Sequence, residues 1–121
     1  MKEIGIGIIG GGYMGKAHAV AMSAVGAVFN TNLRPRLEMV CGSSPKTSKK
    51  YCEAYGFKRA ANTWEELVKD KKVEAVIIAS PQSTHLKIAL MALSLRKPVF
   101  CEKHLGVSIE DGKKMVAAAE K

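Results

Sequence analysis

The chain has 121 residues, of which 47% are hydrophobic and 25% are charged, and its formal net charge is +8. This length and balance predict one globular domain with a buried core, and they exclude a disordered tail, a collagen-like rod and a disulfide-stapled miniprotein. The positive charge favours an anionic ligand or partner without identifying it, so nucleotide phosphate, nucleic acid and acidic lipid all stay open.

The cysteines and the apolar stretches bear on the cellular compartment. Cys41, Cys52 and Cys101 are odd in number and widely spaced, which gives little support to a disulfide framework or a zinc site. No apolar stretch approaches the roughly 20 residues that span a bilayer, and the charged start of the chain is unlike a signal peptide. We therefore expect a cytoplasmic protein that has no metal site and does not contact a membrane.

The first part of the chain predicts a strand, a helix and a loop. Residues 4–9 are an isoleucine-rich run before a glycine cluster, which is typical of a buried strand that ends in a tight turn. Residues 13–25 repeat apolar side chains at steps of three and four, which predicts a helix that Gly26 ends. Residues 26–36 show no clear period, so we expect an irregular connection there.

The rest of the chain continues the alternation of strands and helices. Ser44 and Pro45 supply an N-cap and a first-turn proline, Gly56 supplies a left-handed C-cap, and Thr63 with Glu66 forms a capping box. The remaining expected elements are a strand over 37–41, a helix over 44–55, a short helix from 63, a central strand over 73–79, a helix capped by Thr84 and ending near Leu95, a strand over 98–101, and a last helix opened by Ser108 and Asp111.

This alternation predicts an α/β fold with a doubly wound, mainly parallel sheet of the Rossmann type in a single domain. Gly10, Gly12 and Gly15 form a GxGxxG pattern between the first strand and the first helix, where such sheets bind dinucleotides. Gly10 permits a tight turn, Gly12 lets a diphosphate approach the backbone, and Gly15 lets the helix lie close to the strand. We expect a bound dinucleotide there, and the alternative is a glycine-rich turn without a ligand.

The end of the second strand bears on the choice between NAD and NADP. A site for NAD usually has a carboxylate there that binds the ribose 2′-hydroxyl, and this sequence has Gly42 instead. Ser43, Ser44, Lys46 and Thr47 follow, and they offer hydroxyls and a cation without an anion that would repel a 2′-phosphate. NADP is therefore modestly favoured over NAD. In the alternative interpretation Ser44 only caps a helix and Lys46 is only solvated.

Three segments resemble one family of oxidoreductases. They are residues 7–18 (GIIGGGYMGKAH), residues 79–85 (ASPQSTH) and the pair Glu102 and Lys103. In this order they resemble the family of glucose-fructose oxidoreductase, inositol dehydrogenase and MocA. The resemblance implies that residues 1–121 are the NAD(P)-binding domain. It also implies that the family's C-terminal domain, which binds a sugar, inositol or related polyol and forms the oligomer interface, is absent.

The glycine motif, the end of the second strand and the resemblance together predict which residues form the site. The residues that would contact the cofactor are Gly10, Gly12, Tyr13, Met14, Gly42, Ser43, Ser44, Lys46, Ser80, Pro81, His85, Glu102 and Lys103. Pro81 and His85 would border the nicotinamide, and Glu102 would bind its ribose or position the lysine. Lys103 would be catalytic, because a lysine there can bind a substrate hydroxyl and assist its proton transfer.

The sequence departs from the family pattern at two positions. The family usually has a proline after the lysine, commonly in a cis peptide, and this chain has His104. A cis peptide before a residue other than proline costs about 2.5 to 4 kcal/mol, so we expect a trans peptide and a lysine aimed differently. The second departure is Gln82, where asparagine is common. His18 has an ordinary interpretation as a helix residue bonded to backbone or water.

The leading hypothesis is the cofactor domain of a sugar or polyol dehydrogenase, which alone binds cofactor but turns over no substrate. The alternative is a nucleotide-responsive sensor or regulatory module that does not need Lys103. We expect no nucleic-acid partner, because the lysines are scattered and no aromatic residues interleave with them. The last strand would be an open sheet edge, which predicts a homo-oligomer.

Overall fold

The structure is a computed structural model that describes residues 2–121. Its strands are β1 (Lys2–Ile9), β2 (Leu33–Cys41), β3 (Arg59–Ala60), β4 (Ala75–Ile78) and β5 (Val99–Cys101). Its helices are α1 (Tyr13–Phe29), α2 (Pro45–Tyr55), α3 (Trp64–Lys69), α4 (His85–Ser94) and α5 (Ile109–Ala119), with a short 3₁₀ helix, η1 (Gln82–Thr84), before α4.

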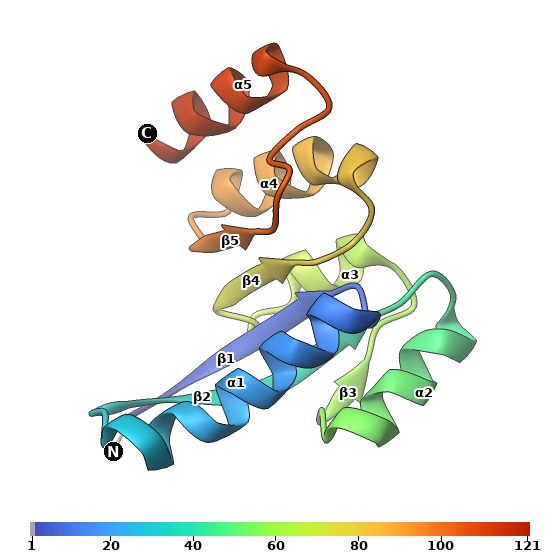
Figure 1. The fold of residues 1–121 in the computed structure, drawn as a ribbon, viewed down its shortest axis with the longest axis vertical. Helices are drawn as coiled ribbons and strands as arrows, with labels where there is room; N and C mark the ends of the chain where they lie inside the picture. The colour runs from blue at the N-terminus through green and yellow to red at the C-terminus, as the bar shows by residue number, and fades with distance from the viewer. Residues whose placement is uncertain (1) are drawn as a thin grey trace.

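The strands form one parallel sheet in the order β3-β2-β1-β4-β5 (Figure 1). The chain starts in the middle of the sheet, winds outward through β2 to β3, and then crosses back to β4 and β5. This doubly wound order confirms the predicted Rossmann-type fold. The strand expected to be central and covered on both faces, β4, lies inside the sheet between β1 and β5, and its residues contribute to the cores on both faces. In residues 2–121, no helix has the length and apolarity needed to cross a bilayer.

Helices cover both faces of the sheet, so each strand contributes to two cores. Ile8 and Val40 pack with α1 and α2, whereas their neighbours Ile9 and Met39 pack with α3 and α4. Successive side chains on a strand point to opposite faces, and both faces are covered, which explains the unbroken apolar runs in the sequence. A fully buried side chain such as Ile8 contributes about 1.5–3 kcal/mol to folding. Helix α5 lies outside the sheet and packs against α4 (Figure 1).

Helix α1 continues past Gly26, where the sequence predicted its end. Gly26 lies inside the helix and faces Arg34 of β2, and a Cβ at this position would overlap the Arg34 side chain. The glycine therefore serves the close packing of α1 on β2, and the left-handed residue that ends the helix is Asn30, with a φ of 50°.

Strand β2 begins earlier than predicted, because Leu33 to Arg36 pair with the start of β1 instead of forming a loop. Two other differences are local. Strand β3 has only two residues, too few to show a period, and the sequence did not predict it. Thr84 makes no side-chain cap for α4, because its hydroxyl donates to the Pro81 carbonyl at 2.6 Å within η1.

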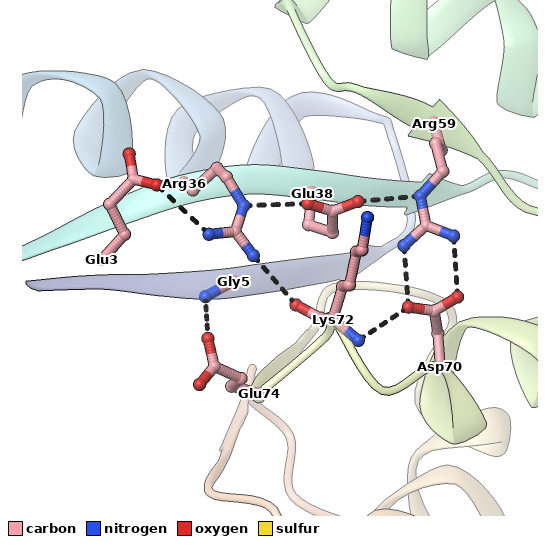
Figure 2. A network of polar contacts seen from close by, with 8 residues as sticks. All are labelled: Glu3, Gly5, Arg36, Glu38, Arg59, Asp70, Lys72 and Glu74. Carbon is pink, nitrogen blue, oxygen red and sulfur yellow. Dashed lines mark hydrogen bonds and ion pairs between the residues drawn. The ribbon is translucent and has the colours of Figure 1, made fainter.

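Charged side chains join the strands at the end of the sheet where β1 begins, opposite the carboxyl ends of the strands (Figure 2). Glu38 is the extra residue at a register shift between β2 and β1, and it is only 3% exposed. Its carboxylate accepts from Arg36 at 2.8 Å and from Arg59 at 2.7 Å. Arg59 also donates two bonds of 2.7 Å to Asp70 at the end of α3. This network ties β2, β3 and α3 together.

The same network sets the protonation of its two carboxyl groups. The hydrogen bonds from Arg59 lower the pKa of Asp70 from 3.8 to about 2. Burial raises the pKa of Glu38, but the hydrogen bonds from Arg36 and Arg59 outweigh this and leave the pKa below its ordinary value. Both groups therefore stabilise the fold in their ionised form.

We predict that Asp70→Asn lowers the free energy of unfolding by about 1–2 kcal/mol at neutral pH and flattens its acid dependence. Because the pKa of folded Asp70 is about 2, below its ordinary 3.8, its contribution is complete above about pH 4 and is lost as the pH falls toward 2. Urea denaturation at a series of pH values measures this. An equal acid dependence in the variant and the parent chain would contradict the assignment.

Candidate functional site

A cleft of about 780 Å³ opens at the carboxyl ends of β1, β2 and β4, which is within the range of small-molecule sites. Its lining comes from the ends of these strands, from the turns that follow them and β3, and from Tyr51 of α2 and Ile88 of α4. The lining residues are Ile9, Gly10, Gly11, Gly12, Cys41, Gly42, Ser43, Tyr51, Asn62, Thr63, Trp64, Glu65, Ala79, Ser80, Pro81, Thr84 and Ile88.

The turn after β1 is built by two close backbone approaches. Gly10 has a φ of 101°, and its N–H donates to the Cys41 carbonyl at 2.7 Å, which joins the ends of β1 and β2. A Cβ at Gly15 would overlap the Gly10 carbonyl oxygen. Only glycine therefore lets α1 begin directly against the end of β1.

Gly12 differs from these two glycines, because a Cβ there would meet nothing within 4 Å. It is the N-cap of α1, has no side-chain cap bond, and accepts the first helical bond from the Lys16 N–H at 2.9 Å. The first N–H groups of a helix have no partner inside it and carry the positive end of the helix dipole. Open space beside these donors is what a diphosphate needs.

The turn after β2 is held by the start of α2. The Gly42 N–H donates to the Ser48 hydroxyl at 2.8 Å. Ser44 and Thr47 form the reciprocal cap: Thr47 N–H donates to Ser44 Oγ at 3.2 Å, and Ser44 N–H donates to Thr47 Oγ1 at 2.9 Å. The N-cap predicted at Ser44 is confirmed, so the Ser44 hydroxyl is engaged in capping α2. Lys46 is exposed on the first turn of α2.

The turn after β3 contributes cleft residues that the sequence analysis missed. Thr63 caps α3, with its Oγ1 accepting from the Glu66 N–H at 3.2 Å. The Glu66 carboxylate accepts from the Asn62 N–H at 3.3 Å, so it does not close the predicted box on Thr63. Trp64 and Glu65 follow in the cleft wall. Only the pairing of β3 with β2 brings this turn to the site, and a two-residue strand gives no sequence signal.

The turns after β4 and β5 are joined through His85. Its ring is 1% exposed, with Nδ1 2.9 Å from the His104 carbonyl oxygen and Nε2 2.9 Å from the Ser80 carbonyl oxygen. Gln82 adds a second link by donating to the Gly106 carbonyl at 2.7 Å. His85 is thus engaged with the backbone of both turns beneath the cleft surface that Ser80 and Pro81 form.

The end of β5 contacts α1 through a short polar link. The Glu102 carboxylate lies 2.5 Å from His18 Nε2, and the His18 ring meets Phe100 edge-on at 5.0 Å. The bond to His18 lowers the pKa of Glu102. Lys103 is exposed beside this link. The Lys103–His104 peptide is cis, so the expectation of a trans peptide is wrong.

The structure brings only part of the predicted site into the cleft wall. The predicted residues that line it are Gly10, Gly12, Gly42, Ser43, Ser80 and Pro81. The predicted residues outside this lining are Tyr13, Met14, Ser44, Lys46, His85, Glu102 and Lys103. Tyr13 and Met14 are exposed on the first turn of α1, at 88% and 41%.

A glycine turn at the central strand and a cleft along the carboxyl edge define a dinucleotide-binding domain of the Rossmann type. A sequence profile described as "Oxidoreductase family, NAD-binding Rossmann fold", that of the Gfo/Idh/MocA proteins, matches residues 4–121. The chain belongs to this family and is its NAD-binding oxidoreductase domain, which confirms the resemblance predicted from the sequence.

Relatives match along nearly the whole chain. Levoglucosan dehydrogenase of Pseudarthrobacter phenanthrenivorans is 31% identical over 121 residues, which cover 99% of this chain and 31% of that protein. Inositol 2-dehydrogenase of Salmonella paratyphi B is 33% identical over 116 residues, which cover 95% of this chain and 33% of that protein. The chain therefore spans about a third of the length of the curated relatives it matches.

A solved structure shows the same fold. The complex of levoglucosan dehydrogenase with NADH and levoglucosan superimposes with a TM-score of 0.96 at 29% identity, covering 99% of this chain and 32% of that one. This likeness confirms the fold class over nearly the whole chain.

We predict that Gly15→Ala lowers the free energy of unfolding by about 1–3 kcal/mol, because its Cβ would overlap backbone that cannot move freely. The matched control is Gly112→Ala in α5, where a Cβ would make an ordinary contact of 3.6 Å with Leu105. The control should be neutral or stabilising, since alanine favours a helix over glycine. Chemical denaturation measures both variants, and equal effects would contradict the close-approach argument.

Proposed function

We propose that the cleft binds a nicotinamide dinucleotide with its diphosphate on the N–H groups of Gly12 and the first turn of α1. The observation that carries this proposal is the open space at Gly12 beside unpartnered helix donors. The cofactor fits the residues present, because the turns after β2 and β3 offer a wall for the adenosine half and Ser80 and Pro81 offer one for the nicotinamide half. When bound, the nicotinamide supplies hydride chemistry.

In the whole protein, the proposed activity is hydride transfer between NAD(P) and a sugar, inositol or related polyol. The printed activities of the relatives support this substrate class. Lys103 is the proposed catalytic residue: it is exposed at the carboxyl end of β5, where an ammonium group can bind a substrate hydroxyl and assist its proton transfer. Glu102, held by His18, would orient the lysine or bind the cofactor ribose. We also propose that the whole protein is a homo-oligomer, as the resemblance to the family implies.

The proposed preference is for NADP. The place of the usual ribose-binding carboxylate is taken by Gly42, and Ser43 lines the cleft beside it. Lys46 is exposed on the first turn of α2, from where its ammonium group can reach toward a 2′-phosphate. Among residues 2–121, the carboxylate that lines the cleft belongs to Glu65, which lies at the start of α3 and not at the end of β2.

We expect the purified chain to bind NADH with a change in the emission of Trp64, the single tryptophan, because this residue lines the cleft. Gly12→Ala should fold as well as the parent chain but bind NADH about tenfold or more weakly, since its Cβ occupies the space proposed for the diphosphate. Circular dichroism provides the control for folding. Undiminished binding by a folded Gly12→Ala would refute the proposed position of the diphosphate.

Cofactor choice is tested by the dissociation constants of NADP and NAD, measured in the same way. We expect tighter binding of NADP, and we expect Lys46→Ala to weaken NADP by about threefold to tenfold while leaving NAD unchanged. Lys49→Ala, an exposed lysine further along α2, is the matched control. Equal or tighter binding of NAD would refute the proposed preference for NADP and would make Glu65 the candidate carboxylate for the ribose.

A further inference from the structure

Two tyrosines one helical turn apart on α2 lie behind the glycine turn. The rings of Tyr51 and Tyr55 stack with their planes 10° apart and their centroids 5.6 Å apart. The Tyr55 hydroxyl donates to the Gly11 carbonyl at 2.7 Å, across 44 positions of the sequence. This is a direct hydrogen bond from α2 to the turn proposed to hold the diphosphate.

The Tyr51 ring fills the space between the turns after β1 and β2. A Cβ at Gly11 would overlap this ring, and a Cβ at Gly42 would lie 3.0 Å from its Cε2 atom. Helix α2 cannot slide away from this position easily, because the Ser44 cap and the bond from Gly42 N–H to Ser48 anchor its first turn to the end of β2. The Tyr51–Tyr55 pair is therefore a fixed support for the glycine turn.

The bond from Tyr55 also determines the direction of a neighbouring donor. The Gly11–Gly12 peptide is trans, so the Gly11 carbonyl and the Gly12 N–H point in opposite directions. Because Tyr55 holds the carbonyl toward α2, the Gly12 N–H points away from α2. As the N-cap donor, this N–H has no partner within α1. Its direction is thus set before any ligand arrives, which reduces the ordering cost of binding.

We propose that Tyr55 is a positioning residue for the cofactor diphosphate, acting through the Gly11–Gly12 peptide, and that Tyr51 holds it in place by stacking. This inference rests on the proposed function. The orientation of the diphosphate donor at Gly12 is thereby assigned to α2, although the diphosphate itself lies at the N-terminus of α1. A dinucleotide fragment that carries the diphosphate depends on this peptide, whereas adenosine alone does not.

The test compares Tyr55→Phe, which keeps the stacked ring but removes the hydroxyl, with the parent chain and with Glu53→Gln, an exposed position of α2. ADP and adenosine are used as competitors against NADH, with Trp64 emission as the readout. We expect Tyr55→Phe to weaken ADP by about threefold to tenfold, the value of one neutral hydrogen bond, while adenosine and the control change less than about twofold.

Gly11→Ala is the second variant, because its Cβ would push the turn away from the Tyr51 ring while both tyrosines remain. It should show the same selective loss of ADP binding, and it decides the question if Tyr55→Phe does not fold. Unchanged ADP binding in the folded variants would overturn the inference, as would an equal loss of ADP and adenosine, which indicates general loosening. Failure of the parent chain to bind NADH is a different result, and it would refute the proposed function instead.

Discussion

The contact of Gly15 with the Gly10 carbonyl is the constraint on which the rest of the structure depends. It lets α1 begin where β1 ends, so the unpartnered N–H groups of the helix lie at the carboxyl end of the central strand. A side chain at Gly15 would separate strand and helix and move these donors away from the turns after β2 and β4. The cleft exists because the backbone approaches itself closely at this one point.

The two ends of the strands have different physical roles. At the amino end, where β1 begins, Glu38 and Asp70 are paired with arginines and hold the strands in register (Figure 2). At the carboxyl end, the turns offer open backbone donors and few paired charges. The ion pairs stabilise the amino end without entering the cleft, which leaves the carboxyl end free for a ligand. Tyr55 ties the end of α2 to the glycine turn at the carboxyl ends of the strands, the turn that would hold the diphosphate of a cofactor.

Local signals predicted much of the fold and the centre of the site. The cap at Ser44, the left-handed Gly56 and the GxGxxG spacing each act over a few residues, so their consequences are visible in the sequence. Tyr51 and Trp64 were missed because only the pairing of distant strands brings them to the cleft. Gly26 was misread for the same reason: its role depends on Arg34, a residue of another element.

The most direct test of the account is a titration of ¹⁵N-labelled protein with NADH, followed through the backbone amide resonances. If the diphosphate lies at the start of α1, the largest shifts occur at the amides of Gly12, Tyr13 and Met14. Binding that leaves these amides unchanged, or that mainly perturbs the exposed lysines away from the cleft, Lys69, Lys71 and Lys72, would contradict it.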